Sequence, residues 1–454
     1  MQRLTPAQLR APFTPTGGTG TGQDDGRIGL EIECGIVRPI TGAAVPYGGA
    51  DGIESILLDI SQAVDGVPQF LDGHLYAMQC PDGTRLSLEP GGAIEYSSPP
   101  EPDLIALVDH AMTALQLVAK AAAGRDAAVL CDALLPFTEL SKAPWIPNRR
   151  VWLMREWWEE RGAAGEASKA ISVLTTSTQL SFDFDGGRDF TEKVRMQMAV
   201  SPIVAALCVN SPLAEGRLTG VASRRMELLL AEDPERSGFP SFAMKPDLGI
   251  DDFVAWALSR PMLYRYRNGH YGHAPKMALK DAMSTGFPDG TFPTDADWAS
   301  QQSQLWPFVR PRHTLEVRLA DGPPYPYFGA LAALWTGLTY HPESRDSAWR
   351  LMRDRSQPEQ MELTAEVAKT GLEAFCGPRP VRDVAIELVE LARAGIEARI
   401  RAGRENRRAV KLLEPFADIL RTGVTFAEQK QKAWNGELGG RPDRYVEAYR
   451  VPVG

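Results

Sequence analysis

Acidic residues inside apolar, strand-like segments constrain this chain more than any other feature of its sequence. Residues 85–100 read RLSLEPGGAIEYSSPP. The letters SLE and IEY alternate as in strands, and PGG between them is typical of a turn or a β-bulge. Such a pair of strands would bring Glu89 and Glu95 to one site.

Two further short segments repeat this pattern. Residues 28–34 (IGLEIEC) and 314–318 (TLEVR) are apolar and strand-like, and each carries two charged side chains two positions apart. Side chains two positions apart in a strand point to the same face of a sheet. The pairs expected to share a face are Glu31 with Glu33 and Glu316 with Arg318.

Burial of these carboxylates needs a compensating charge. An ionised carboxylate is costly to bury unless it is paired or bound to a cation, and Mg²⁺ prefers such oxygen ligands. Three acidic strands in one chain therefore predict a Mg²⁺ site. Salt bridges or solvent-exposed sheet faces are the alternative, and for a single Glu-x-Glu pair they are the commoner outcome.

These segments and their order resemble the glutamate–cysteine ligases of the plant and proteobacterial type, and the related enzyme of actinobacterial ergothioneine synthesis. The resemblance runs from about residue 27 to about residue 436, and the combination of SLEPGG with LEVR-x-x-DG is its most specific part. Other matching segments are 194–216, 261–271, 306–322 and 421–436. The family implies an ATP-dependent joining of a carboxylate to an amine.

Composition and charge narrow the possible partners. The chain has 454 residues, of which 44% are hydrophobic and 24% charged, and this is enough for a large core. Its net charge is −9 and it has no long basic cluster, so neither nucleic acid nor an anionic membrane is expected as a partner. The expected partners are small amino acid and amine substrates, and the oligomeric state stays open.

Length alone would allow two or three domains. The resemblance implies one catalytic domain over residues 27–454, mostly helical from about residue 344, behind a flexible N-terminus over residues 1–26. The Gly-rich stretch at 17–22 lacks the preceding strand and the Gly-Lys-Ser/Thr of a phosphate loop, so its composition favours a linker.

Cysteine usage indicates the cellular compartment. Five cysteines are scattered without Cys-x-x-Cys spacing, at positions 34, 80, 131, 208 and 376. This pattern indicates neither a zinc site nor a disulfide framework. The chain also lacks a secretion signal and any run of 18 apolar residues, so we expect a soluble, cytoplasmic protein.

Hydrophobic patterning favours an α+β fold. It predicts strands over residues 28–37 and 171–185, and helices over residues 102–123 and 191–207. The order has no regular βαβ rhythm, and carboxylates on strand interiors favour a curved antiparallel sheet with flanking helices. The family implies the same architecture, similar to the glutamine synthetase catalytic domain.

Positions that match the family's motifs imply roles at the catalytic end. A ligase of this kind forms an acyl phosphate from ATP, while Mg²⁺ and cationic side chains neutralise the charge that moves. The resemblance implies that Glu316 and Arg318 are catalytic, with Arg318 beside the transferred phosphoryl group. The implied metal ligands are Glu31, Glu33, Glu89, Glu95 and Glu316.

Other matching positions imply the binding of amino acids. Arg155, Arg225 and Arg236 match arginines near the family's substrate, where an arginine can clamp a carboxylate through two hydrogen bonds. Tyr266 matches an aromatic position of the same site. The alternatives are a surface ion pair for each arginine and core packing for the tyrosine.

The segment around residue 180 departs from the family, which has a methionine pair followed by R-T-C-T-V-Q-V-N-L-D-F. The implied substrate residues in this segment are Thr176, Gln179 and Ser181. Gln179 and Asp183 are retained. The replaced positions are Ile171–Ser172 (the methionine pair), Leu174 (Arg), Thr176 (Cys), Ser181 (Asn), Glu227 (His) and Leu229 (Trp). These changes put the identity of the donor or the acceptor amine in doubt.

Two main hypotheses follow. The first is a glutamate–cysteine ligase that forms γ-glutamylcysteine. The second is an amide-forming ligase of a specialised biosynthetic pathway, with the same mechanism and a different donor or acceptor. A non-catalytic binding protein of the same fold is a third hypothesis, and the retained carboxylates and Arg318 argue against it.

Overall fold

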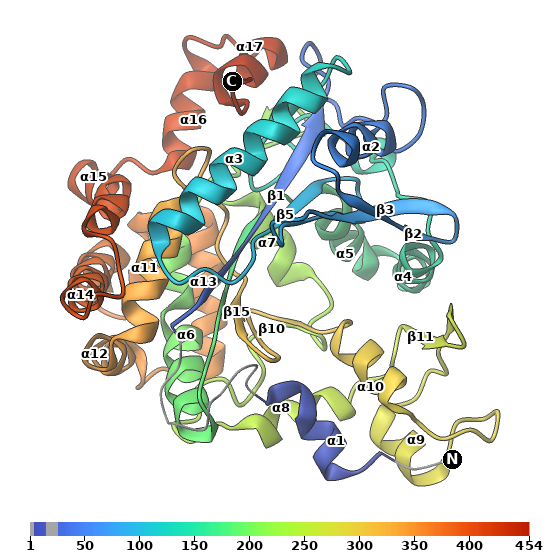
Figure 1. Cartoon of the computed structure of the whole chain (residues 1–454). Coiled ribbons are helices and arrows are strands. Elements are labelled where there is room, and N and C mark those ends of the chain that lie inside the picture. The colour runs from blue at the N-terminus through green and yellow to red at the C-terminus, as the bar shows by residue number, and fades with distance from the viewer. Residues whose placement is uncertain (1–3, 15–25, 454) are drawn as a thin grey trace.

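One large antiparallel sheet organises the computed structural model, which describes residues 4–14 and 26–453 (Figure 1). Within these residues the sheet has nine strands. Their order is β14 (Val309–Pro311), β15 (Leu315–Val317), β7 (Thr178–Phe182), β1 (Ile28–Val37), β5 (Ile94–Ser97), β4 (Arg85–Leu88), β3 (His74–Gln79) and β2 (Val67–Leu71), and β6 (Ala128–Leu130) also pairs with β1. Every pairing in it is antiparallel, so the predicted α+β fold is confirmed.

The central strand β1 separates two environments. Ile28, Leu30 and Ile32 are fully buried in the hydrophobic core. Glu31 and Glu33 alternate with them and therefore point to the opposite face of the sheet. The sequence of β1 thus gives the sheet one apolar face and one acidic face.

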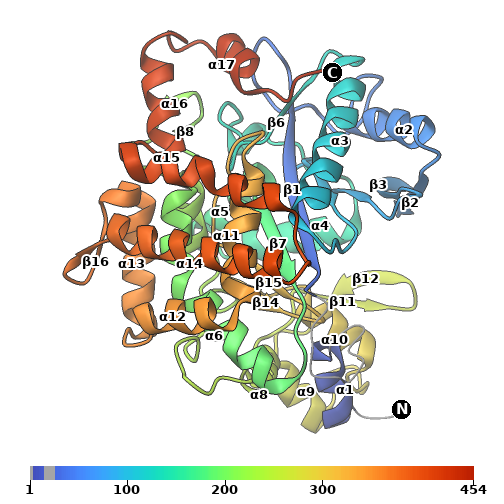
Figure 2. The same cartoon turned by 60° about the vertical axis from the view of Figure 1, so that its left-hand side comes forward.

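Helices cover the apolar face. α3 (Leu104–Ala123) lies against β1, β5 and β6, and its N-terminus is capped by the side chain of Asp103. α6 (Gly187–Leu207), α11 (Phe328–Tyr340) and α14 (Val381–Arg401) contact one another beside it (Figure 2). α11 is buried along its whole length, as expected of a helix in the middle of a core.

Among the described residues, α3 is also the one helix long and apolar enough to cross a membrane by length and composition. A single such helix is weak evidence for a membrane span. Its buried side chains, among them Leu104, Leu107 and Leu115, belong to the core that covers the sheet.

The acidic face is surrounded by a second group of elements. They are α4 (Arg149–Glu159), α5 (Ala163–Leu174), α7 (Arg224–Ala231), the hairpin of β11 (Tyr264–Arg267) and β12 (His270–His273), and the short parallel pair of β10 (Ser237–Gly238) and β13 (Trp306–Pro307). α8 (Ile250–Leu258), α9 (Leu279–Thr285) and α10 (Asp295–Gln302) complete this half of the molecule, whereas α2 (Ile53–Ala63) packs against α3 and β3.

The chain beyond residue 341 folds mostly into helices. They are α12 (Pro342–Met352), α13 (Gln357–Thr370), α14, α15 (Glu414–Thr422), α16 (Phe426–Asn435) and α17 (Pro442–Tyr449). A buried ion pair connects α16 to the segment after β6, because Lys430 Nζ donates to Asp132 Oδ1. Tyr445 OH, on α17, donates to the other oxygen of Asp132 at 2.9 Å.

The structure differs from the prediction at the N-terminus. Residues 4–14, predicted as part of a flexible segment, contain α1 (Pro6–Arg10) and a turn of 3₁₀ helix over Ala11–Phe13. A capping box between Thr5 and Gln8 starts α1, and the buried Leu9 and Phe13 side chains hold it against the core. The Gly-rich stretch at 17–22 lies outside the described residues.

The predicted strand over residues 171–185 is also shorter than expected. Only Thr178–Phe182 forms β7, and residues 171–174 are the last turn of α5. The β-branched residues there favour a strand by propensity, but Val173 and Leu174 pack in an apolar cluster as part of α5. Tertiary packing overrides the local preference at this point.

A close contact between α11 and α14 generates a stability prediction. A Cβ atom at Gly337 would lie 2.1 Å from the carbonyl oxygen of Ala392, where no side chain fits. We expect Gly337→Ala to lower the free energy of unfolding by about 1–3 kcal/mol, as overpacking does. Urea denaturation would measure this. Gly187→Ala on α6, where nothing lies within 4 Å, is the control, and an equal effect of the two changes would contradict the prediction.

Candidate active site

The register of the sheet brings the predicted acidic residues onto one face. Glu33 on β1 lies opposite Glu95 on β5, and Glu31 lies opposite Gln179 on β7. On the far side of β7, Ser181 lies opposite Glu316 of β15. Residues directly opposite each other in an antiparallel pair share a face, so these side chains all point to the same side.

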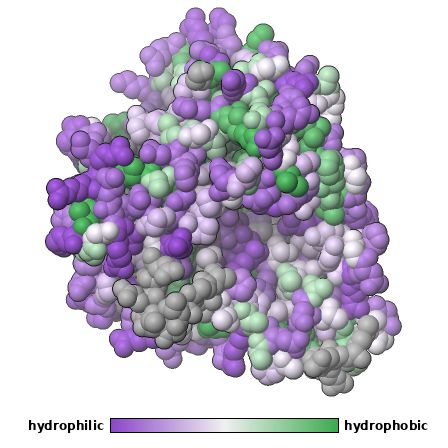
Figure 3. Space-filling model, in the orientation of Figure 1, coloured by the Kyte–Doolittle hydropathy of each residue, from purple (hydrophilic) through white to green (hydrophobic). Residues whose placement is uncertain are grey.

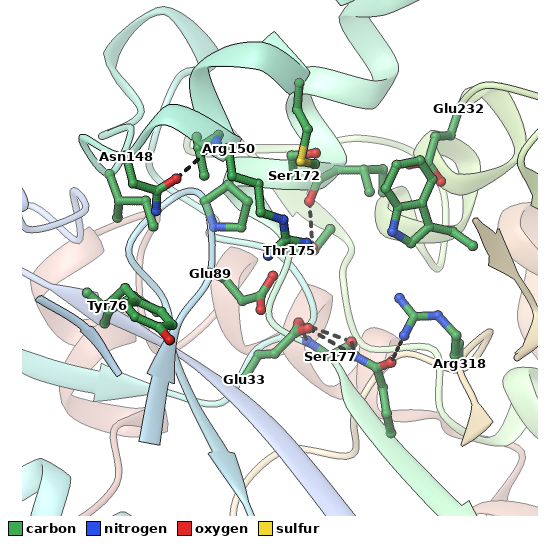
Figure 4. A pocket seen from close by; sticks show the side chains of 18 of the residues that line it. Glu33, Tyr76, Glu89, Asn148, Arg150, Ser172, Thr175, Ser177, Glu232 and Arg318 are labelled. Carbon is green, nitrogen blue, oxygen red and sulfur yellow. Dashed lines mark hydrogen bonds between the residues drawn. The ribbon is translucent and has the colours of Figure 1, made fainter. Parts of the chain in front are cut away.

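Three carboxylates form the tightest acidic group. Oxygen atoms of Glu33, Glu89 and Glu95 all lie within 4.8 Å of one another. Figure 4 shows Glu33 and Glu89 directed toward each other. The Ser177 backbone N–H donates to Glu33 Oε2 at 2.6 Å, and Gln179 Nε2 donates to Glu33 Oε1 at 3.0 Å. These donors fix the position of Glu33 within the group.

Burial and repulsion between like charges raise the pKa values of carboxylates on this face. Burial raises the pKa of Glu89 to about 7, and the neighbouring Glu33 contributes. Burial raises the pKa of Glu95 to about 8, and Glu89 adds to it. The pKa of Glu31 is also well above its usual range because of burial and the charge of Glu95. A divalent cation bound by carboxylate oxygens would relieve this repulsion, so the donor set fits Mg²⁺.

Glu316 is held differently from the other four carboxylates. Arg310 donates two hydrogen bonds to it, at 2.8 and 2.9 Å, and Arg318 Nη1 donates a third. Burial alone would raise its pKa, but the two arginines outweigh burial and hold the pKa at about 2. The same Arg318 atom also donates to Gln179 Oε1, so Glu316 and Gln179 together fix the Arg318 guanidinium.

A cavity of about 290 Å³ opens beside this group. Figure 3 shows the face of the molecule hollowed at this level between polar side chains, and Figure 4 shows the interior. Its polar lining residues include Glu33, Glu89, Asn148, Arg150, Gln179, Arg225, Glu232 and Arg318. Its aromatic lining residues are Tyr76, Tyr266, Tyr271, Trp306 and Phe308. The cavity thus combines carboxylates, arginines and aromatic walls.

Comparison with known proteins decides the family. The family model described as "Glutamate-cysteine ligase family 2(GCS2)" matches residues 27–448. The chain belongs to glutamate–cysteine ligase family 2. The chloroplastic glutamate–cysteine ligase of Brassica juncea is 31% identical over 360 residues, covering 79% of this chain and 68% of that protein. That of Solanum lycopersicum is 30% identical over 428 residues, covering 93% and 78%. The predicted resemblance and the prediction of an enzyme of this ligase type are confirmed.

A solved structure has a similar fold. The glutamate–cysteine ligase of Francisella tularensis, solved in complex with AMP, has a TM-score of 0.54 and covers 94% of this chain and 90% of its own. Its sequence identity is 11%. This likeness concerns the fold, and it agrees with the architecture expected for the family.

Gln179, Arg225 and Tyr266 line the cavity as the resemblance to the glutamate–cysteine ligase family implies. Arg225, however, does not present a free guanidinium for a carboxylate clamp. It donates to the carbonyl oxygens of residues 318, 319 and 320 at 2.9 to 3.1 Å, and lies 3.6 Å from Asp321. Arg225 therefore holds the backbone that carries Arg318.

The other two arginines implied by the ligase family lie outside the cavity lining. Arg155 pairs with Glu159 at 2.7 Å and lies between the rings of Trp145 and Trp152. Arg236 is fully buried and pairs with Asp233 at 3.2 Å. Both side chains form ion pairs within the protein, and neither lines the cavity.

Thr176 and Ser181, which the resemblance also implies as substrate residues, lie outside the cavity lining as well. Thr176 precedes Ser177, and neighbouring residues of an extended chain point to opposite sides, so its buried side chain lies away from the cavity. Ser181 is on the acidic face, near Glu316, but does not line the cavity. Leu174 is the last residue of α5 and lies in an apolar cluster. These three departures from the family therefore do not shape the pocket directly.

Two charged cavity residues were missed by sequence reasoning. Arg150 lies on α4, and its Nε donates to Tyr264 OH at 3.0 Å. Glu232 follows the last turn of α7. The spacing on α4 offered no signal, because Arg150 with Met154 and Val151 with Arg155 are both four residues apart, and Arg150, Val151 and Met154 all line the cavity. Nothing in the sequence marked Glu232 either.

The raised pKa values generate a prediction for the metal-free protein. In the unfolded chain Glu95 ionises near pH 4 to 5, whereas in the folded protein it binds its proton up to about pH 8. Folding is therefore opposed increasingly as the pH rises through this range. We expect Glu95→Gln to raise the melting temperature by roughly 2–4 °C at pH 8 and by less at pH 6.

Thermal unfolding in the presence of a chelator would measure this difference. Glu366→Gln, an exposed position on α13, is the matched control and should change neither value. Equal stabilisation by Glu95→Gln at both pH values would mean that Glu95 is not protonated in the folded protein.

Proposed function

We propose that this chain is an ATP- and Mg²⁺-dependent ligase that joins the side-chain carboxylate of glutamate to the amine of cysteine through an acyl phosphate. The observation that carries the proposal is the convergence of Glu33, Glu89 and Glu95, of which Glu33 and Glu89 line one cavity together with Arg318. Membership of glutamate–cysteine ligase family 2 supports the choice of reaction. The AMP complex of the Francisella tularensis enzyme supports the use of an adenine nucleotide.

The residues of the acidic group would hold Mg²⁺. When bound, Mg²⁺ supplies positive charge to phosphate oxygens. Hydrogen bonds from the Ser177 N–H and from Gln179 hold the Glu33 carboxylate in place for the cation. Hydrogen bonds to Gln179 and Glu316 orient the Arg318 guanidinium. Arg318 then offers a fixed positive charge to the phosphoryl group as it is transferred, which is the main electrostatic requirement of the reaction.

Arg150 is the candidate receptor for a substrate carboxylate. Among the described residues, no carboxylate lies within 4.0 Å of its guanidinium, and Tyr264 is its hydrogen-bond partner. Figure 4 shows its side chain directed into the cavity toward Glu89. An arginine that is already oriented and lacks an ion pair suits bidentate binding of a carboxylate.

A second candidate function has its own support. Ile171 and Ser172, which replace the family's methionine pair, line the cavity, and so does Leu229, which replaces a tryptophan. These departures change the size and polarity of the pocket wall. They favour an amide-forming ligase with the same chemistry and another donor or acceptor amine.

One experiment separates the two candidates. Release of ADP would be measured with ATP and Mg²⁺ across a grid of amino acids and amines. Release that requires glutamate and cysteine together supports the first candidate, and another productive pair supports the second. Absence of release with every pair would argue for a binding protein.

The acidic group generates a catalytic prediction. We expect Glu33→Gln to lower kcat for ADP release on the order of 10²-fold or more, because a ligand of the cation and its charge are both lost. The measurement is steady-state kinetics at saturating Mg²⁺, with Glu390→Gln on the exposed side of α14 as the control. Full activity of Glu33→Gln would remove this residue from the site.

Arg150 generates a second catalytic prediction. We expect Arg150→Lys to raise KM for the amino acid donor at least tenfold more than KM for ATP, since lysine cannot form the bidentate contact. Arg155→Lys, on the same helix and outside the cavity, should leave both constants close to those of the parent. The prediction is wrong if the two variants behave alike.

A further inference from the structure

Glu232 is a cavity carboxylate that the reaction described so far does not use. It is buried, 4% exposed, and lines the cavity. Of the carboxylates among the described lining residues, Glu33 and Glu89 belong to the acidic group, which leaves Glu232. In Figure 4, Glu232 lies on the same side of the cavity as Arg318, while Arg150 and Glu89 lie on the other side.

The hydroxyl group of Ser237 fixes this side chain. Ser237 Oγ donates to Glu232 Oε2, and no described residue donates to Oε1. Ser237 begins β10, which is tied to β13 by a hydrogen bond from the Trp306 backbone N–H to the Arg236 carbonyl at 2.7 Å. Trp306 itself lines the cavity. One carboxylate oxygen is thus anchored and the other is left for a ligand.

The charges around the cavity indicate which substrate group binds the free oxygen of Glu232. Arg150 and Arg318 suit the carboxylate and phosphate groups of the substrates. The acceptor amine is the substrate group that arrives with a positive charge, because a primary amine is mostly protonated near neutral pH. It must lose a proton before its nitrogen can attack. The donor's own ammonium group is remote from the reacting carboxylate, so a carboxylate near Arg318 faces the attacking amine.

We propose that Glu232 binds the ammonium group of the acceptor amine and removes its proton, an inference that rests on the proposed ligase function. One proton passes from R–NH₃⁺ to Glu232, which gives R–NH₂ and a neutral carboxylic acid. The nitrogen lone pair then forms the C–N bond at the acyl carbon, and the bond from this carbon to the phosphate oxygen breaks with its electron pair. The second nitrogen proton leaves with the phosphate, and Glu232 returns its proton to water.

The ionisation of Glu232 suits this role. Burial raises its pKa to about 7, while Ser237 and the charges of Arg318 and Arg225 oppose the rise and Asp233 adds to it. Glu232 therefore accepts a proton above about pH 7 and carries one below. A general base works best when its pKa is near the working pH.

Hydroxylamine allows a direct test, because it is mostly uncharged near neutral pH and traps acyl phosphates without prior loss of a proton. We expect Glu232→Gln to lower kcat/KM for cysteine on the order of 10²-fold, and to lower hydroxamate formation from glutamate, ATP and hydroxylamine far less. In the parent protein, activity with cysteine should fall below pH 7 as Glu232 becomes protonated. This pH dependence should be absent from Glu232→Gln. Glu235→Gln, exposed in the same loop, is the matched control.

The outcomes are distinct. Equal loss of hydroxamate and amide formation in Glu232→Gln, or no loss of either, would overturn the role of Glu232. If Glu232→Gln does not fold, Glu232→Asp keeps the charge, and a loss confined to amide formation would support the proposal while an equal loss would overturn it. A wild-type protein that forms neither hydroxamate nor ADP with any carboxylate would overturn the proposed function, and this inference with it.

Discussion

Repulsion among buried carboxylates is the constraint on which the site depends. Glu33, Glu89 and Glu95 lie within 4.8 Å of one another on the polar face of the sheet, an arrangement that opposes folding when no cation is bound. The apolar face of β1 packs under α3, and this packing stabilises the sheet that carries the three carboxylates. One face of β1 therefore carries the functional carboxylates, which destabilise the fold, and the other face carries the apolar side chains that stabilise it.

The sequence predicted the acidic face well because strand geometry determines it. A period of two fixes which side chains share a face, so the spacing of Glu31 and Glu33 is enough to place them together. The turn at PGG did the same for Glu89 and Glu95. The α+β class and the helices that contain residues 102–123 and 191–207 followed from similarly local patterns.

The roles of the arginines could not be predicted in the same way. Arg150 and Arg155 lie on one helix, and only its packing against β11 decides which of them faces the cavity. Arg225 reaches the cavity, but the carbonyl groups around Arg318 occupy its donors. Thr176 and Leu174 seemed to belong to a strand that lines the pocket, whereas the strand begins only at Thr178. Each of these placements depends on a long-range contact that no spacing in the sequence records.

Helix α7 carries two functions in eight residues and the turn that follows. Arg225 in its first turn holds the backbone of Arg318, while Leu229 and Glu232 near its end form part of the cavity wall. Any movement of this helix would disturb the phosphoryl end and the amine end of the site together. Within this fold, a change of acceptor during evolution is therefore most easily reached by exchanging side chains on a fixed α7, and the replacement of the family's tryptophan by Leu229 is a change of that kind.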